Sequence, residues 1–278
     1  MKQHPSLLTK LTLGLLLCIS VLIFSVVVLS KEPILNVDGN TTNQQKLSET
    51  LSAKIANETL FDTAQYYFNQ DEDPAPPYDL EKAEYYFKKA IEEDPASNPL
   101  LWYQAGRVDF INGNFNEALL KFDTQIQYFG DQVPNVYYMI GLTNGFKART
   151  TGYEGDWKKA EEGFQKSITF FRGAPWPYVD LAWIYFSQGK YTDMKPLLEE
   201  AFTYDSNNAW LLNMYGLALL NTGDRMMAHE YFLFAQEQAE KLTVKDWSKS
   251  YPGNDPRLWD LGLQEFKSLI AKNVTLSK

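Results

Sequence analysis

The segment AWLLNMYGLALLNTGDRMMAHEYFLFA, residues 209–235, contains two apolar patterns on either side of a turn signal. Small and apolar residues recur at helical spacing, first at Leu212, Tyr215, Gly216 and Leu219 and then at Ala228, Phe232 and Ala235. Each set would lie on one face of a helix. Gly223 stands between them and can end the first helix by adopting a positive φ. The segment therefore predicts two short helices joined by a tight turn.

The same pattern occurs four more times along the chain. The matching positions are Leu60, Ala64, Tyr67, Ala83, Phe87 and Ala90; Trp102, Ala105, Gly106, Ala118 and Phe122; Tyr137, Ile140, Gly141, Ala160 and Phe164; and Tyr178, Leu181, Ala182, Tyr185, Met194, Leu198 and Ala201. Equivalent residues Ala160, Met194 and Ala228 follow one another at intervals of 34. A fixed period of this length indicates a repeat architecture, in which each unit buries its apolar face against its neighbours.

Two of the five units are longer than the others between their two patterns. The extra residues fall at Asp71–Asp79 (DEDPAPPYD) and at Lys147–Asp156 (KARTTGYEGD). Both segments contain Pro, Gly or several charges, which are typical of loops. We therefore expect an enlarged loop in the first unit and another in the third.

The repeat resembles the tetratricopeptide repeat (TPR), a helix–turn–helix unit with a small residue in its first helix and an Ala-x-x-x-Phe pair in its second. The resemblance covers residues 57–241 and implies an all-α, right-handed solenoid of about five repeats. Gly106, Gly141 and Gly216 would allow the two helices of a unit to approach closely. Phe122, Phe164 and their equivalents would fill the space between neighbouring units, and Gly113, Gly189 and Gly223 would end first helices.

Two further segments flank the repeats, one on the N-terminal side and one on the C-terminal side. Residues 31–46 are polar and predict a linker, and a helix is expected to begin near Leu47, so the repeat domain is assigned to 47–241. The C-terminal segment, 242–278, contains Asp255-Pro256, a helix-start signal. The residues expected to form the apolar face of the following helix are Leu258, Leu261, Gly262, Phe266, Leu269 and Ile270. This helix is predicted to cap the last repeat, whereas the residues from Thr243 to Asn254 have no assignment.

The N-terminus contains a long apolar run. Residues 1–10 carry Lys2 and Lys10 but no acid, and Leu11–Ser30 is uncharged over its whole length. A helix of this length spans the hydrocarbon layer of a bilayer, which predicts a transmembrane anchor. A cleaved signal peptide is the alternative, although its apolar region is normally shorter. The two lysines favour a cytoplasmic N-terminus with the body on the extracytoplasmic side.

Composition and motifs exclude several classes of function. The formal net charge of -9 argues against nucleic-acid binding, because phosphate backbones are recognised by basic surfaces. With one cysteine and two distant histidines, the sequence contains no recognisable metal motif. It also lacks the common hydrolase, nucleotide-binding and metalloprotease signatures. We therefore expect neither an enzyme nor a bound metal or cofactor.

The resemblance also implies a concave face lined by the first helix of each unit. The candidate partner-binding residues carried over in this way are Tyr103, Arg107, Phe110, Tyr138, Met139, Trp176, Asp180, Trp183, Phe186, Trp210, Asn213 and Met214. Arg107 is the only cation among them, which argues against the family's clamp for C-terminal carboxylates. The set is mainly aromatic and apolar, and such a surface suits a helix or an extended peptide.

These features together predict a membrane-anchored scaffold that binds a protein or peptide partner in an aromatic groove. Trp176, Trp183, Tyr138 and Trp210 are the expected anchors, because buried aromatic residues dominate such contacts. Two alternatives remain open at this point. The aromatic face could bind an envelope glycan such as peptidoglycan, or the chain's own terminal helices could fill the groove and make it purely structural.

Overall fold

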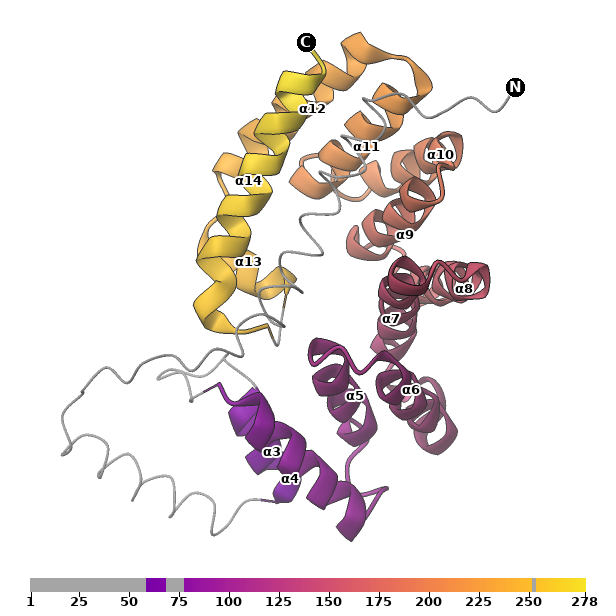
Figure 1. Ribbon diagram of the computed structural model, residues 1–278, viewed down its shortest axis with the longest axis vertical. Coiled ribbons are helices and arrows are strands. Elements are labelled where there is room, and N and C mark those ends of the chain that lie inside the picture. Colours follow the sequence, from indigo (N-terminus) through magenta and orange to yellow (C-terminus); the bar gives the residue numbers. More distant parts are fainter. Residues whose placement is uncertain (1–58, 69–77, 252–253) are drawn as a thin grey trace, which may run out of the picture. The chain divides into compact units, whose positions relative to one another are not determined.

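The structure, a computed structural model, describes residues 59–68, 78–251 and 254–278. Within these ranges the chain forms twelve α-helices and two 3₁₀ turns, and contains no strand. The predicted anchor Leu11–Ser30, the linker and the helix expected from Leu47 lie outside the described residues. The described chain forms two compact units (Figure 1). We call residues 59–68, 78–133 and 254–256 the N-terminal unit, and residues 134–251 with 257–278 the C-terminal unit.

The N-terminal unit contains two of the predicted repeats. Its helices are α3 (Leu60–Phe68), α4 (Leu80–Glu93), α5 (Leu101–Ile111) and α6 (Phe115–Phe129), followed by the 3₁₀ turn η1 (Gly130–Gln132). Helices α3, α4, α5 and α6 pack against one another in chain order. Phe61 and Phe68 of α3 contact the ring of Phe87 in α4, which lies in the core of this unit.

The C-terminal unit contains the other three repeats and the C-terminal helices. The bounds are α7 (Asn135–Thr151), α8 (Glu154–Phe170), α9 (Trp176–Ser187), α10 (Tyr191–Phe202), α11 (Ala209–Thr222), α12 (Arg225–Glu240), α13 (Val244–Ser250) and α14 (Trp259–Leu276). The 3₁₀ turn η2 (Pro256–Leu258) precedes α14, and its first residue is counted with the N-terminal unit. Consecutive helices from α7 to α12 pack against each other, and α9 also contacts α7 and α11. First helices therefore stack on first helices, with α8 and α10 on the other side (Figure 1).

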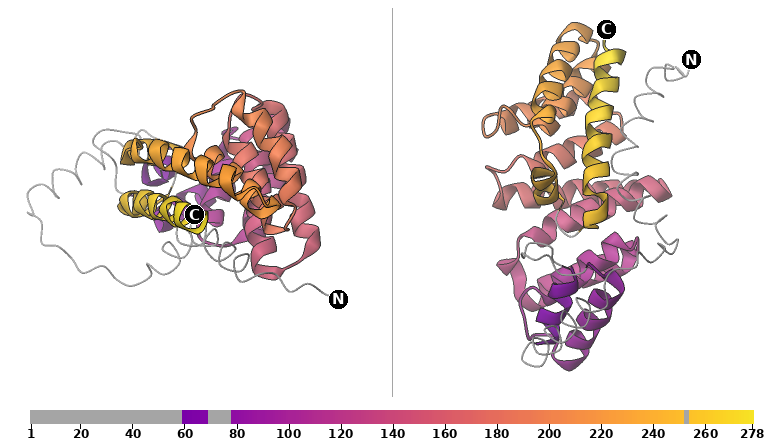
Figure 2. Two further views of the ribbon diagram at one scale, coloured as in Figure 1. Left: turned by 90° about the horizontal axis from the view of Figure 1, so that it is seen from above. Right: turned by 90° about the vertical axis from the view of Figure 1, so that its left-hand side faces the viewer.

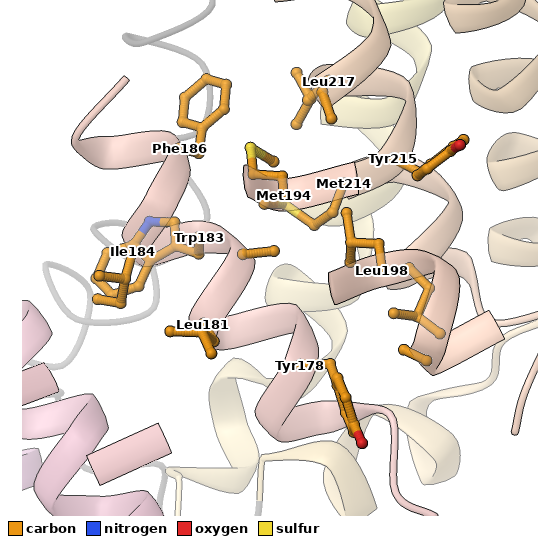
Figure 3. Packing of buried hydrophobic residues seen from close by; sticks show 14 of the residues in the cluster. Tyr178, Leu181, Trp183, Ile184, Phe186, Met194, Leu198, Met214, Tyr215 and Leu217 are labelled. Atoms are coloured by element: carbon orange, nitrogen blue, oxygen red, sulfur yellow. The ribbon is translucent and has the colours of Figure 1, made fainter. Parts of the chain in front are cut away.

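The core of the C-terminal unit is continuous from one repeat to the next. Met194 and Leu198 of α10 lie close to Met214 of α11, while Trp183 points away from them (Figure 3). All of these residues belong to one buried cluster that runs from Ala160 in α8 to Val274 in α14. A repeat of this kind cannot bury its apolar residues alone, so neighbouring repeats stabilise one another.

In the second, third and fifth repeats, a glycine of the first helix faces a phenylalanine of the second helix. A β-carbon on Gly106 would come within 2.5 Å of the Phe122 ring, and one on Gly216 within 2.6 Å of the Phe232 ring. The prediction that glycines permit close helix approach is therefore confirmed. The rings of Phe122 and Phe232 pack against the first helix of their own unit, and Phe164 and Phe232 also belong to the buried cluster that neighbouring repeats share.

Several helix ends follow the sequence signals. Gly113, Gly189 and Gly223 have φ values of 79, 72 and 96° and follow the ends of α5, α9 and α11. This confirms the predicted role of these three glycines. Gly152, with φ of 70°, ends α7 in the same way.

The third repeat differs from the prediction of an enlarged loop at Lys147–Asp156. Helix α7 continues to Thr151, and α8 begins at Glu154 after a short turn. The extra residues therefore lengthen both helices. Residues 147–151 contain no glycine or proline that would end the helix. Ala148 is fully buried, and the Lys147 Nζ and Asp156 Oδ1 atoms are 3.5 Å apart, so the added turns are held by packing and by an ion pair. The corresponding segment of the first repeat lies mostly outside the described residues, but Asp79 caps α4 by accepting from the Lys82 N–H.

The C-terminal segment packs onto the last repeat, as predicted for a capping helix. Helix α14 lies alongside α12 (Figure 2). Its buried face contains Gly262, Leu263, Phe266, Leu269 and Ile270, whereas Leu261 is exposed. The predicted face is thus corrected at two positions: Leu263 and not Leu261 faces the core, and Leu258 lies in the 3₁₀ turn η2 before the helix begins.

The unassigned residues 243–254 include helix α13. Thr243 and Asp246 form a capping box at its start, in which the side chain of each residue accepts a hydrogen bond from the backbone N–H of the other. Trp247 of this helix is almost completely buried and contacts the ring of Phe266 in α14. No helix within the described ranges is both long and apolar enough to cross a membrane.

Candidate functional site

The predicted partner-binding residues fall into a buried set and a half-buried set. The buried residues are Tyr103, Met139, Trp183, Phe186, Asn213 and Met214, and the half-buried residues are Arg107, Phe110, Tyr138, Trp176, Asp180 and Trp210. None of the twelve is fully exposed. Half of the predicted surface is therefore packed within the protein.

In the N-terminal unit, Arg107 lies against neighbouring side chains of its own unit. Its Nη1 donates to Oε1 of Gln104 at 2.7 Å, and its guanidinium carbon lies 4.9 Å from the centre of the Phe68 ring. Phe110 packs on the core of this unit, and Tyr103 contacts the Phe122 ring. These residues hold α5 against α3 and α6.

Trp183 lies in the contact between α7 and α9. A β-carbon on Gly145 of α7 would come within 2.8 Å of the Trp183 ring, and the rings of Phe146 and Trp157 lie 5.7 and 6.4 Å from it, centre to centre. The side chain is 8% exposed. Trp183 therefore acts as a packing residue between two repeats, and Phe186 is similarly buried against Tyr191.

The C-terminal helices cover the first-helix residues of the last repeat. Trp210 stacks on Phe266 of α14 with ring centres 4.8 Å apart, and its Nε1 donates to the Tyr251 hydroxyl at 3.2 Å. Asn213 is 2% exposed, and its Oδ1 accepts from Nδ2 of Asn273 in α14 at 2.9 Å. Trp210 and Asn213 of α11 are thus covered by the C-terminal helices of the chain itself.

Three half-buried residues remain together on the first helices of the other two repeats. Tyr138 of α7 donates its hydroxyl to Oδ2 of Asp180 in α9 at 2.6 Å. The Tyr138 ring also meets Trp176 edge to face, with 4.5 Å between ring centres. Trp176 and Asp180 are one turn apart on α9 and share a face. We call Tyr138, Trp176 and Asp180 the α7–α9 cluster.

The electrostatics of the α7–α9 cluster centre on its carboxylate. Burial raises the pKa of the Asp180 carboxyl from 3.8 to about 6, although the hydrogen bond from Tyr138 acts in the opposite direction. The pKa of Tyr251 is raised by burial and further by the charge of Asp180. Tyr251 therefore lies within the electrostatic reach of this cluster.

Sequence reasoning missed the residues that cover Trp210. Trp247, Tyr251 and Phe266 surround it, yet two of them come from the segment that had no assignment. The Thr-x-x-Asp pattern at Thr243 was the available signal for a helix there. In the described part of the chain, no group of three or more His, Cys, Asp or Glu residues is placed to hold a metal ion.

Comparisons with known proteins agree with the helix–turn–helix repeat seen in the structure. Residues 177–208, which form one helix pair, match the family model of the tetratricopeptide repeat. A search of the curated proteins gives no match to this sequence. Two crystal structures of MamA are similar in fold. The first has 22% sequence identity and a TM-score of 0.51, and covers 59% of this chain and 90% of that chain. The second has 20% sequence identity and a TM-score of 0.51, and covers 69% of this chain and 96% of that chain.

A thermophilic TPR protein from Thermus thermophilus is also similar. Its identity is 17% and its TM-score 0.50, over 69% of this chain and 91% of that chain. At such identities the likeness concerns the fold alone. The family model therefore supports a tetratricopeptide repeat at residues 177–208, and the solved structures support a helical repeat fold over the part of the chain that they cover.

Proposed function

We propose that the chain is a non-catalytic TPR scaffold that binds a protein or peptide through the α7–α9 cluster. The observation that carries this proposal is the half-burial of Tyr138, Trp176 and Asp180 on adjacent first helices. The other candidates in this unit pack against the chain, and Trp210 is stacked on Phe266. A partner that covers the cluster would gain apolar contact with Trp176 and polar contact with Asp180.

Peptide selection tests this function directly. The full chain in detergent would be screened with displayed random peptides of about twelve residues, a length that spans several side-chain anchors. We expect selected peptides to bind the unaltered chain and to lose at least about tenfold in affinity for Trp176→Ala.

Tyr153→Ala is the matched control, because it removes an aromatic ring that is 64% exposed in the turn before α8. This variant should retain the affinity of the unaltered chain. Circular dichroism would confirm that both variants are folded. If no peptide is selected, or if Trp176→Ala binds as tightly as the unaltered chain, the proposed site is wrong.

We further propose that Leu11–Ser30 anchors the chain in a membrane, with the repeats on the extracytoplasmic side. The support for this is the uncharged run and the lysines before it. A short tether would raise the effective concentration of the body near a membrane partner to about the millimolar range. Protease added to intact cells should digest the body, and the mature chain should retain residues 1–30 by mass spectrometry. Protection of the body, or a mature mass that lacks this segment, would contradict the proposal.

A further inference from the structure

We propose that Asp180 is the binding site for a lysine or arginine side chain of the partner. This inference rests on the proposed function and adds the chemistry of the group that the cluster recognises. The partner is therefore a peptide segment that presents one basic residue next to an apolar or aromatic one.

The first argument is the missing counter-ion. The residue Asp180 is half-buried, and no lysine or arginine within residues 59–68, 78–251 and 254–278 pairs with its carboxylate. The Tyr138 hydroxyl is its hydrogen-bond donor. An ionised carboxylate can accept about four hydrogen bonds, so acceptor positions remain for a donor from outside the chain.

Comparison with two other aspartates shows how this chain treats buried carboxylates. Asp109 lies next to Lys121 and Asp156 next to Lys147, and in both pairs a lysine neutralises an acid on a neighbouring helix. Asp180 occupies the same kind of helix–helix contact without such a lysine. A cation from a partner would complete the pattern that the other two aspartates show within the chain.

The second argument is the aromatic surroundings of Asp180. Trp176 lies one turn earlier on α9, and Tyr138 contacts both residues. Aromatic faces attract cations, and arginine in particular combines stacking with two parallel hydrogen bonds to a carboxylate. A carboxylate next to a tryptophan and a tyrosine therefore matches a basic side chain in both charge and shape.

The charge of the chain argues against the alternative ligands. Asp180 would repel a carboxylate or a phosphate, and the formal net charge of the whole chain is -9. Burial raises the pKa of the Asp180 carboxyl, and the described part of the chain supplies no lysine or arginine that would lower it. Binding of a positively charged lysine or arginine side chain would favour the ionised form of Asp180 and lower the pKa of its carboxyl.

The test uses the peptides selected above on the unaltered chain. The selected sequences should be enriched in lysine or arginine at one position, and that residue would be replaced by citrulline or norleucine in the tightest binder. We expect the uncharged peptide to bind the unaltered chain about tenfold more weakly. Asp180→Asn should bind the basic and the uncharged peptide equally.

Asp193→Asn is the matched control, because Asp193 is exposed in the first turn of α10 and its loss changes the net charge by the same amount. It should keep the preference for the basic peptide. Peptides that bind through Trp176 but show no basic preference, or a preference that survives in Asp180→Asn, would overturn this inference and leave the proposed function intact. Failure to select any peptide would overturn both.

Discussion

The backbone of Gly141 in α7 lies directly against Gly163 in α8. A β-carbon on Gly163 would come within 2.6 Å of the Gly141 nitrogen and 3.0 Å of the Tyr137 carbonyl oxygen. Both obstacles are backbone atoms, which cannot move aside as the end of a side chain can. This contact lets the two long helices of the third repeat cross closely.

Replacing Gly163 by alanine should therefore destabilise the protein. We expect a loss of about 2 kcal/mol or more in the free energy of unfolding, even though alanine favours a helix. Urea denaturation of the chain followed by circular dichroism would measure it. Gly173→Ala is the control, because a β-carbon there meets nothing within 4 Å and should change stability by less than about 0.5 kcal/mol. Equal stability of the two variants would mean that the helices separate at little cost.

The two phenylalanines of α12 offer a second matched comparison. Phe232 is fully buried against Gly216, whereas Phe234 is 38% exposed. Phe232→Ala should cost about 3–5 kcal/mol, because it leaves a cavity between the helices of the last repeat. Phe234→Ala should cost less than about 1 kcal/mol. Similar urea midpoints for the two variants would contradict this assignment of the core.

The amide pair between α11 and α14 gives a third prediction. Asn273→Ala leaves the Asn213 carbonyl oxygen buried without its donor, which should reduce stability by about 1–3 kcal/mol. Lys272, the preceding residue, is exposed, and Lys272→Ala should have almost no effect. Hydrogen exchange would show whether α14 opens locally. Unchanged protection of the α14 amides in Asn273→Ala would show that apolar contacts alone hold this helix.

Asp180 predicts a pH dependence of stability. Its pKa is about 6 in the folded protein and 3.8 as the reference for an unfolded chain, so the folded state binds the proton more tightly. The free energy of unfolding should therefore fall as pH rises from about 4 to about 6, by about 2–3 kcal/mol from this group. Within the described part of the chain, the titratable groups facing it are the phenols of Tyr138 and Tyr251, and burial raises the pKa of Tyr251 further above this window.

Asp180→Asn should remove that decrease. At about pH 7 the variant should be more stable than the unaltered chain, and at about pH 4 the two should be nearly equal, because the unaltered carboxyl is then protonated in the folded state. Asp193→Asn controls for the change in net charge. If Asp180→Asn is less stable than the unaltered chain at about pH 7, the ionised carboxylate stabilises the folded state, and the predicted destabilisation by its burial is wrong.

The repeat itself could be predicted from the sequence because its physics is local. The pairing of Gly216 with Phe232 and the positive φ of Gly223 both follow from residue size and backbone freedom. The helix lengths of the third repeat were harder to predict, because glycine and charged residues suggested a loop after Lys147. Burial of Ala148 and pairing with Asp156 outweighed those local preferences and extended the helices.

The positions of the candidate binding residues were predictable only in part. Family geometry placed Tyr138, Trp176 and Asp180 on neighbouring first helices, and the structure brings them together. It could not show that Trp183 would be buried against Gly145, since that depends on how closely α7 and α9 approach. Nor could it show that Phe266, far along the chain, would stack on Trp210.

Helix α14 has a consequence for assembly. Stacked helical repeats expose an unfinished face at their last pair, and copies of such a chain could in principle add end to end into open fibres. Here the side of α12 where a sixth pair would attach is already covered by α14, whose residues Phe266 and Ile270 are buried. Growth from this end would require α14 to leave first, so we expect this helix to oppose polymerisation of the chain.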